Sequence, residues 1–182
     1  KVSPNILEME DVTFTSQEIK DYLAKIGKDL WTQDLWEGLQ QFENAKTFGS
    51  LIRPVIKDVP YLRRRMQDAG LFEDLFLSQT NEKVEMVLEM SEYLSSRYHV
   101  VVANPPYFGK GMDAEYKQFA QDYFPISKAD TLSMFIERNL EFALKHGYVG
   151  MITLMSWMFL STFEKLREKI LNEDTILSMA HL

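Results

Sequence analysis

A run of apolar, mostly β-branched residues, Val100–Ala103, stops abruptly at Asn104, Pro105 and Pro106. An apolar run without polar alternation is typical of a strand in a parallel sheet that is covered on both faces. Proline has no backbone N–H and cannot continue the ladder of such a strand, so the strand must end here. In open α/β sheets, ligands bind beyond the carboxyl ends of the strands. The sequence therefore predicts a buried parallel strand that places Asn104 at a ligand-binding edge.

The residues after this strand follow the order expected of βα units. Apolar residues recur there at helical spacing in some segments and form short continuous runs in others. Gly147, in "LKHGY", has the position of a glycine just after a helix C-terminus, with Lys145 and His146 in the last turn. The expected elements are helices over 114–122, 130–145 and 163–171 and strands over 148–154 and 175–182. This half of the chain is therefore predicted to be α/β, with βα units of a Rossmann-like parallel sheet.

The first half of the chain carries a helical pattern. Thr15 and Glu18 have the spacing of a capping box, and apolar residues follow on one helical face. Leu35, Leu39 and Phe42 form the apolar side of the next helical segment. The expected helices span 15–26, 30–45, 59–69 and 81–96. We therefore expect a mainly helical segment over residues 1–96, followed by a second segment over residues 97–182.

The charge balance limits how this chain can meet a nucleic acid. It has 27 acidic and 20 basic residues among 182, which gives a net charge of -7. Such a chain has no overall attraction to phosphate, so a nucleic-acid contact needs a local basic patch or a part outside this sequence. Arg63, Arg64 and Arg65 are consecutive, and a helix would spread them around its girth. A solvated helix face is therefore favoured over a DNA-backbone patch.

Several classes of protein are disfavoured by composition. The chain has no cysteine, which excludes disulfides, thiolate zinc sites and thiol nucleophiles and agrees with a cytoplasmic location. The longest apolar run, Tyr148–Leu160, is shorter than the roughly 20 residues that span a bilayer, so no membrane partner is expected. The three histidines are far apart in sequence, so no metal site is expected. Because the chain begins with Lys1, we expect a fragment of a larger protein.

The residues that close the strand suit a flat amine. The Asn104 side chain offers an acceptor oxygen, and Pro105 leaves a carbonyl that the ring of Pro106 helps to hold rigid. Two adjacent acceptors match the two in-plane hydrogens of an amino group. The ring of Tyr107, with Phe108 beside it, could then stack on the flat system that carries the amine. The pattern predicts a site for an aromatic amine or an amide nitrogen.

At "NPPY", after the strand "VVVA", the sequence resembles S-adenosylmethionine-dependent amino methyltransferases, chiefly the adenine-specific DNA methyltransferases that form N6-methyladenine. From "NPPYFGKGM" through "KHGYVGMI" to the segment ending "EKIL", it is similar to the methyltransferases of BREX phage-defence systems. It is more loosely similar to fused restriction-modification enzymes. The upstream "NAKTFGSLIRP" extends the resemblance, which covers most of residues 44–182.

The resemblance implies a role for each residue of the motif. Asn104 and the Pro105 carbonyl, held by Pro106, would accept hydrogen bonds from the target amine. Tyr107, with Phe108, would stack on an adenine that has left the DNA duplex. Phe135, in "LSMFIE", falls where the family places an aromatic ring against the adenine of S-adenosylmethionine, and Asn104 also borders this cofactor. Trp157 would lie near the rim of the pocket.

The resemblance also implies parts that this chain does not contain. The family's glycine-rich cofactor loop and the acidic residue that binds the cofactor ribose have no match in the sequence. Residues 1–10 would be a remnant of the third strand. We therefore expect the catalytic half of a larger enzyme, whose contacts with double-stranded DNA lie mostly outside this chain. Other phage-defence proteins are expected as further partners.

Other interpretations remain open from the sequence. A related "NPPY" presents a side-chain amide in the methyltransferases that modify glutamine in protein release factors. The chain could instead be an inactive structural or partner-binding module, because the cofactor loop is missing. "FGKG" does not have the spacing of a phosphate-binding loop, since Gly111 follows the lysine where Ser or Thr is required. A flexible lid is favoured for that segment.

Overall fold

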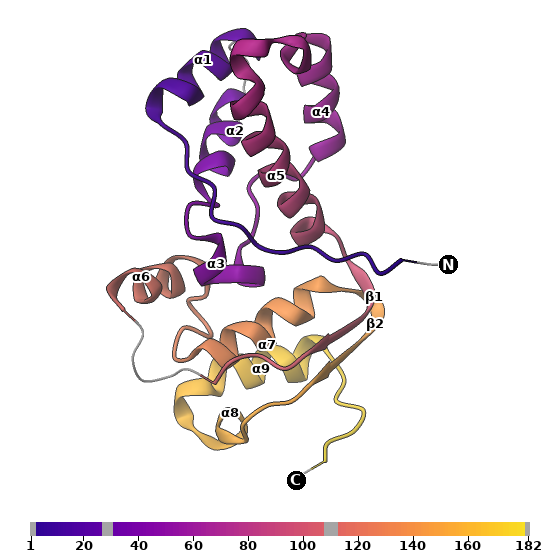
Figure 1. Cartoon of the computed structure of the whole chain (residues 1–182). Helices are drawn as coiled ribbons and strands as arrows, with labels where there is room; N and C mark the ends of the chain where they lie inside the picture. Colours follow the sequence, from indigo (N-terminus) through magenta and orange to yellow (C-terminus); the bar gives the residue numbers. More distant parts are fainter. Residues whose placement is uncertain (1–2, 27–30, 108–112, 181–182) are drawn as a thin grey trace. The chain divides into compact units, whose positions relative to one another are not determined.

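The computed structural model describes residues 3–26, 31–107 and 113–180. The chain divides into two compact units, Lys1–Ser96 and Arg97–Leu182 (Figure 1). All described elements of the first unit are helical. They are α1 (Ser16–Ile26), α2 (Trp31–Gln40), α3 (Ala45–Phe48), η1 (Gly49–Leu51), α4 (Val59–Asp68), η2 (Leu71–Glu73), η3 (Leu75–Leu77) and α5 (Ser78–Ser95).

The core of the helical unit consists of apolar residues at the predicted positions. Leu35, Leu39 and Phe42 are fully buried, as are Ile19 and Tyr22 of α1. The predicted helix over 30–45 is shorter in the structure, because a turn at residues 41–44 separates α2 from the short helix α3. The helices predicted over 59–69 and 81–96 correspond to α4 and α5, although α5 begins three residues earlier.

The capping box at the start of α1 is confirmed. Thr15 N donates to Glu18 Oε2 at 2.7 Å, and Glu18 N donates to Thr15 Oγ1 at 3.1 Å. Lys83 of α5 donates to the other carboxylate oxygen of Glu18 at 2.8 Å. The hydrogen bond from Lys83, together with the Thr15 N–H, lowers the pKa of Glu18 to about 2. One carboxylate therefore caps α1 and links it to α5.

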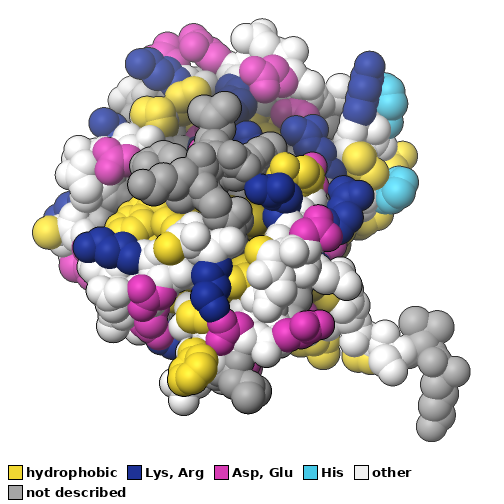
Figure 2. Space-filling model, turned by 90° about the horizontal axis from the view of Figure 1, so that it is seen from above, with side chains coloured by type: hydrophobic (Ala, Val, Ile, Leu, Met, Phe, Trp, Pro, Cys, Tyr) yellow, Lys and Arg dark blue, Asp and Glu magenta, His cyan; other side chains and the backbone are white. Residues whose placement is uncertain are grey.

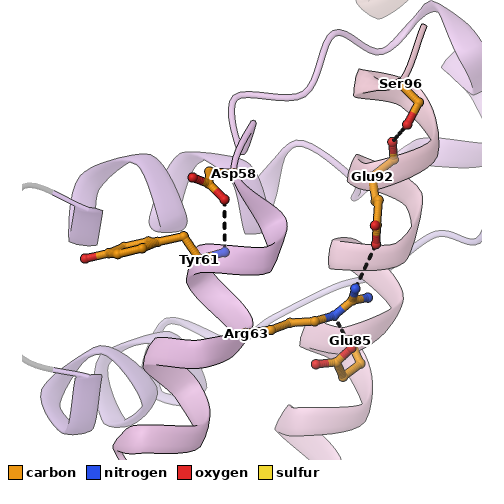
Figure 3. A network of polar contacts seen from close by, with 6 residues as sticks. All are labelled: Asp58, Tyr61, Arg63, Glu85, Glu92 and Ser96. Atoms are coloured by element: carbon orange, nitrogen blue, oxygen red, sulfur yellow. Dashed lines mark hydrogen bonds and ion pairs between the residues drawn. The ribbon is translucent and has the colours of Figure 1, made fainter.

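The first of the three consecutive arginines of α4 is paired with two carboxylates of α5. On the face of the molecule seen in Figure 2, basic and acidic side chains are interspersed. Arg63 donates to Glu85 at 3.1 Å and to Glu92 at 2.7 Å, so its charge joins α4 to α5 (Figure 3). Arg64 is exposed and donates to the Pro60 carbonyl of its own helix. Arg63 is therefore neither solvated on all sides nor free for a phosphate.

Parallel strands and helices make up the second unit. Its two described strands, β1 and β2, pair in parallel, which confirms the predicted α/β class. Leu132 and Ile136 form its core with Leu166 and Ile170 of the last helix. The elements are β1 (Tyr98–Ala103), α6 (Ala114–Tyr123), α7 (Thr131–Phe142), β2 (Ala143–Met151), α8 (Ser156–Phe159), η4 (Ser161–Phe163) and α9 (Glu164–Glu173).

The interpretation of Gly147 as a helix-ending glycine is wrong. Helix α7 ends at Phe142, and residues 145–147 belong to β2. Among the described non-glycine residues, His146 has a left-handed backbone, with a φ of 68°. Gly147 is needed for close packing, because a Cβ there would lie 2.9 Å from the Leu144 carbonyl oxygen and 3.0 Å from that of His99.

This close approach accompanies an irregularity at the start of the strand pair. Tyr98 pairs with Ala143, whereas Val100 pairs with Tyr148. From Val100 onward the register is regular and ends with Ala103 opposite Met151. The extra residues of β2 are therefore confined to the amino edge of the sheet.

The prediction that the first strand is covered on both faces is wrong for this chain. Val100 and Val102 are 59% and 80% exposed, whereas Val101 and Ala103, which alternate with them, are half-buried. Helix α7 packs against both strands and covers only one face. A continuous apolar run shows that a strand can be buried on both faces, but burial requires a second layer that the described residues do not supply.

Two other predicted strands are absent from the described residues. Residues 175–180, expected to begin a strand, have no regular secondary structure and are exposed. Residues 3–10, expected as a strand remnant, are likewise irregular. A strand needs a hydrogen-bonded neighbour, and among the described residues neither segment pairs with another strand. In the described parts of the chain, no helix is both long and apolar enough to cross a bilayer.

Candidate functional site

Strand β1 delivers the polar motif to the carboxyl edge of the sheet, as the sequence predicts. The ladder between the strands extends one step beyond β2, where Ile152 N donates to Ala103 O at 3.2 Å. The next residue, Asn104, is exposed. Pro105 is buried, whereas Pro106 and Tyr107 are exposed. The first proline therefore anchors the loop, and the residues on either side of it face solvent.

Asn104 and Tyr107 are brought together by a hydrogen bond. The Tyr107 hydroxyl donates to Asn104 Oδ1 at 3.0 Å. An amide oxygen has two lone pairs, so Oδ1 can still accept a second hydrogen bond from an incoming amine. The Tyr107 side chain is 45% exposed, which leaves part of its ring accessible for stacking. An acceptor and an aromatic face thus lie side by side at one strand end.

The remaining members of the predicted site are less closely joined. Phe108, the second predicted stacking residue, lies outside the described residues, as does the "GKG" segment after it. Phe135 lies half-buried in the first half of α7. Among the described residues, no hydrogen bond or ring contact joins Phe135 to Asn104 or Tyr107. Its contact with a cofactor stays a prediction.

Trp157 has a structural role in the described fold. Its ring packs against the core of the second unit, and its Nε1 donates to Thr153 Oγ1 at 3.2 Å. Its backbone carbonyl accepts from Arg167 Nη1 at 2.8 Å. Core packing is thus one role of this aromatic residue, and its place near the rim of the pocket stays a prediction.

A buried polar network in the second unit is absent from the sequence-based predictions. Glu137 of α7 is 5% exposed and accepts from Ser127 Oγ at 2.6 Å and from Lys169 Nζ of α9 at 3.3 Å. Ser133 Oγ donates to the Ser127 carbonyl. The four-residue spacing of Ser133 and Glu137 places both on one helical face, which is a signal that could have indicated this network. It fixes the loop between α6 and α7.

Acidic and histidine side chains do not gather at the site. Over residues 3–26, 31–107 and 113–180, no group of three or more His, Asp and Glu side chains is placed to hold a metal ion. The chemistry available at the strand end is therefore that of an amide oxygen, a backbone carbonyl and an aromatic ring. This set can orient a planar amine and polarise its hydrogens.

Comparison with known proteins gives a consistent result. Residues 13–182 match the model of the family described as Eco57I restriction-modification methylase. The chain is 36% identical over 152 residues to "Adenine-specific methyltransferase BrxX" of Escherichia coli O9:H4 (strain HS), an alignment that covers 81% of this chain and 13% of that protein. It is 35% identical over 190 residues to "Adenine-specific methyltransferase PglX" of Lacticaseibacillus casei (strain Zhang), which covers all of this chain and 16% of that protein. The chain thus spans only a small part of the length of these relatives.

Proposed function

Because the chain belongs to the Eco57I restriction-modification methylase family, we propose that it holds the target amine in an enzyme that methylates N6 of adenine in DNA. The observation that carries this proposal is the placement of Asn104 and Tyr107 beside each other at the exposed end of β1. The names of the two relatives support adenine as the base. Phage defence and restriction-modification are the processes that the family and the resemblance to BREX enzymes suggest.

In this proposal the strand end presents two acceptors to one amino group. Asn104 Oδ1 and the Pro105 carbonyl accept the two in-plane hydrogens, which draws the nitrogen lone pair out of conjugation with the ring. The target adenine reaches them only after it leaves the base stack, which costs a few kcal/mol. Stacking on Tyr107 offsets part of this cost. The methylated nitrogen then loses its extra proton to water, so no residue of this chain is required as a base.

The residues at this edge fit one side of S-adenosylmethionine. The Asn104 amide is exposed, and its nitrogen makes no hydrogen bond to another described residue. Phe135 offers a half-buried ring from α7. When bound, the cofactor supplies an electrophilic methyl group. Asn104 and Phe135 would border it, and the remaining contacts would come from parts of the protein outside this sequence. We place the reaction in the cytoplasm.

The proposal is tested by methylation of duplex DNA with the protein that carries this sequence and with its Asn104→Ala variant. Removing the acceptor should lower kcat by about 10²-fold or more, the size of effect seen when one polar partner of a transition state is deleted. Calorimetry should show that affinity for S-adenosylmethionine changes little. N6-methyladenine in digested DNA is the readout.

Asn172→Ala is the matched control, because Asn172 is an exposed asparagine on α9 in the same unit. It should leave methylation unchanged. Full activity in Asn104→Ala would contradict the proposed mechanism. Transfer of the methyl group to a glutamine of a protein, with none to DNA, would show that the substrate is a protein. No methyl transfer to either substrate would favour a structural module.

A further inference from the structure

A pocket lined by three lysines lies in the second unit, and no motif residue is among the residues that line it. Lys117 of α6, Lys128 of the α6–α7 loop and Lys165 of α9 surround a cavity of about 420 Å³. Gln121 and Thr162 add polar groups, and the other lining residues are apolar. No acidic side chain is among the described residues that line it. All three lysines are exposed and form no ion pair with another described residue.

The topology places this pocket at the same edge of the sheet as Asn104. Helix α7 ends at Phe142, directly before Ala143, which pairs with Tyr98 at the amino end of β1 (Figure 1). The 12 residues of α7 run back along the strands, so the loop before α7 lies at the carboxyl edge. Thr162 and Lys165 follow the carboxyl end of β2. Lys165 lines the same pocket as Lys128 of this loop, so both lysines belong to the edge where the motif begins.

Both walls of the pocket are held in place by buried or bridging contacts. On one side, Ser127 is fully buried and is bonded to Glu137 and Ser133, which fixes the backbone next to Lys128. On the other side, Arg167 donates to the carbonyls of Trp157 and Leu160 at 2.8 and 2.7 Å, which fixes the turn before η4. The lysines therefore extend from an ordered frame, so little backbone ordering is needed on binding.

We propose that the three-lysine pocket binds a backbone phosphate of the DNA strand that carries the target adenine. Lysine is a compact cation that binds phosphate as a point charge. Because the net charge of -7 gives no overall attraction to phosphate, a DNA contact made by this chain itself needs a local excess of positive charge, and this pocket supplies one. A site for a small molecule usually buries most of its ligand. The three lysines of this pocket are exposed, and exposed cations suit a DNA backbone that passes over the surface. This inference rests on the proposed function, because that function makes the bound DNA strand the one that carries the target adenine.

The test compares two triple variants with the same change in net charge. Lys117, Lys128 and Lys165 are changed to Gln in the first variant. In the control, Lys20, Lys57 and Lys145 are changed to Gln; these are exposed and make no ion pair with another described residue. Binding of a fluorescent duplex is followed by anisotropy between about 50 and 200 mM salt, where the slope of log K against log salt counts phosphate contacts. Circular dichroism shows that each variant is folded.

The pocket variant should flatten this slope by about 1, because the three lysines are proposed to contact one phosphate. The control should keep the wild-type slope. In the methylation assay, the pocket variant should raise the KM for DNA several-fold and leave kcat unchanged. A single Lys128→Gln variant should show a smaller shift in the same direction.

An unchanged slope in the pocket variant would overturn this inference, as would a wild-type protein that binds no duplex. Tighter binding of inorganic phosphate or a free nucleotide than of duplex would also overturn it, because the pocket would then hold a small anion. The proposed function fails on a different result, namely the absence of DNA methylation by the wild-type protein. A slope effect without methylation would leave the phosphate site standing and reject the proposed reaction.

Discussion

At the scale of single residues, the hydrogen bond between Tyr107 and Asn104 gives the tyrosine two separable properties. Its hydroxyl occupies one lone pair of Asn104 Oδ1, whereas its ring supplies the exposed face. The approach of an amine can proceed through the second lone pair or by displacement of the hydroxyl, and neither requires the phenol to react. The ring should therefore matter for base binding and the hydroxyl should not.

Replacing Tyr107 by Phe and by Ala separates these properties. Tyr107→Phe keeps the ring and should leave DNA methylation within a few-fold of wild type. Tyr107→Ala removes base stacking, which is worth about 1–3 kcal/mol, and should raise the KM for DNA by about 5- to 150-fold. Steady-state kinetics on duplex DNA measures both. Equal losses in the two variants would show that the hydroxyl, and not the ring, carries the effect.

The prediction of single residues succeeded where the controlling interactions are local. The capping box of Thr15 and Glu18 and the burial of Leu35 and Leu39 follow from spacing within one helix. The position of Asn104 after the strand likewise follows from proline's missing donor. The contact between Tyr107 and Asn104 depends on how the loop turns after Pro105, which residue types alone do not determine.

At the scale of elements, two ion pairs that share Arg63 join α4 to α5, and we call them the Arg63 fork. Arg63 lies between Glu85 and Glu92, which are seven residues apart on α5 and therefore share one helical face. All three side chains are about a third to a half exposed, so each ion pair is screened by solvent. The fork therefore adds a modest amount of stability.

The stability of the helical unit should respond to Arg63 and not to its neighbour. Arg63→Ala should lower the free energy of unfolding by about 0.5–1.5 kcal/mol, the sum expected for two exposed pairs and some packing. Arg64→Ala should change it by less than about 0.5 kcal/mol. Urea unfolding followed by circular dichroism gives both values, and high salt should reduce the Arg63 effect. Equal losses for the two variants would contradict a role for the fork.

Element types were more predictable than element ends. Helices α1, α4, α5, α6 and α9 and strand β1 lie where periodicity places them. The boundary between α7 and β2 was misplaced because "LKHGY" has the composition of a helix end, whereas Gly147 serves the close approach of two backbones. The strand predicted from residue 175 onward was wrong for a different reason. An apolar segment such as Thr175–Ala180 becomes a strand only beside another strand with which it can pair.

At the scale of the whole molecule, the second unit displays an apolar sheet face. Val100, Val102 and Tyr148 are each more than half exposed on adjacent parallel strands. Among the described residues, each strand also has one edge without a partner strand. A contiguous apolar face with open strand edges favours association between copies. The 182-residue chain by itself should therefore form larger species as its concentration rises.

Val102→Lys should weaken this association, because a charge on the exposed face must be desolvated in any face-to-face or edge-to-edge contact. Sedimentation velocity over about a tenfold range of concentration should show less mass increase for this variant than for wild type. Leu171→Lys is the control, since Leu171 is 70% exposed and belongs to α9, not to either strand. A mass increase that is the same in Val102→Lys and wild type would show that association uses another surface.

The pairing of β1 with β2 also bears on how sequences of this kind can change length. Five residue steps in β2, from Ala143 to Tyr148, cover the distance that two steps cover in β1, from Tyr98 to Val100. An insertion or deletion in this bulged segment changes the amino edge alone and leaves Ala103 opposite Met151. One inserted residue between Val100 and Ala103 would instead turn every later side chain to the other face and carry Asn104 with it. Variation in length should accumulate on the amino side of the bulge, and the last four residues before the motif should keep a constant spacing.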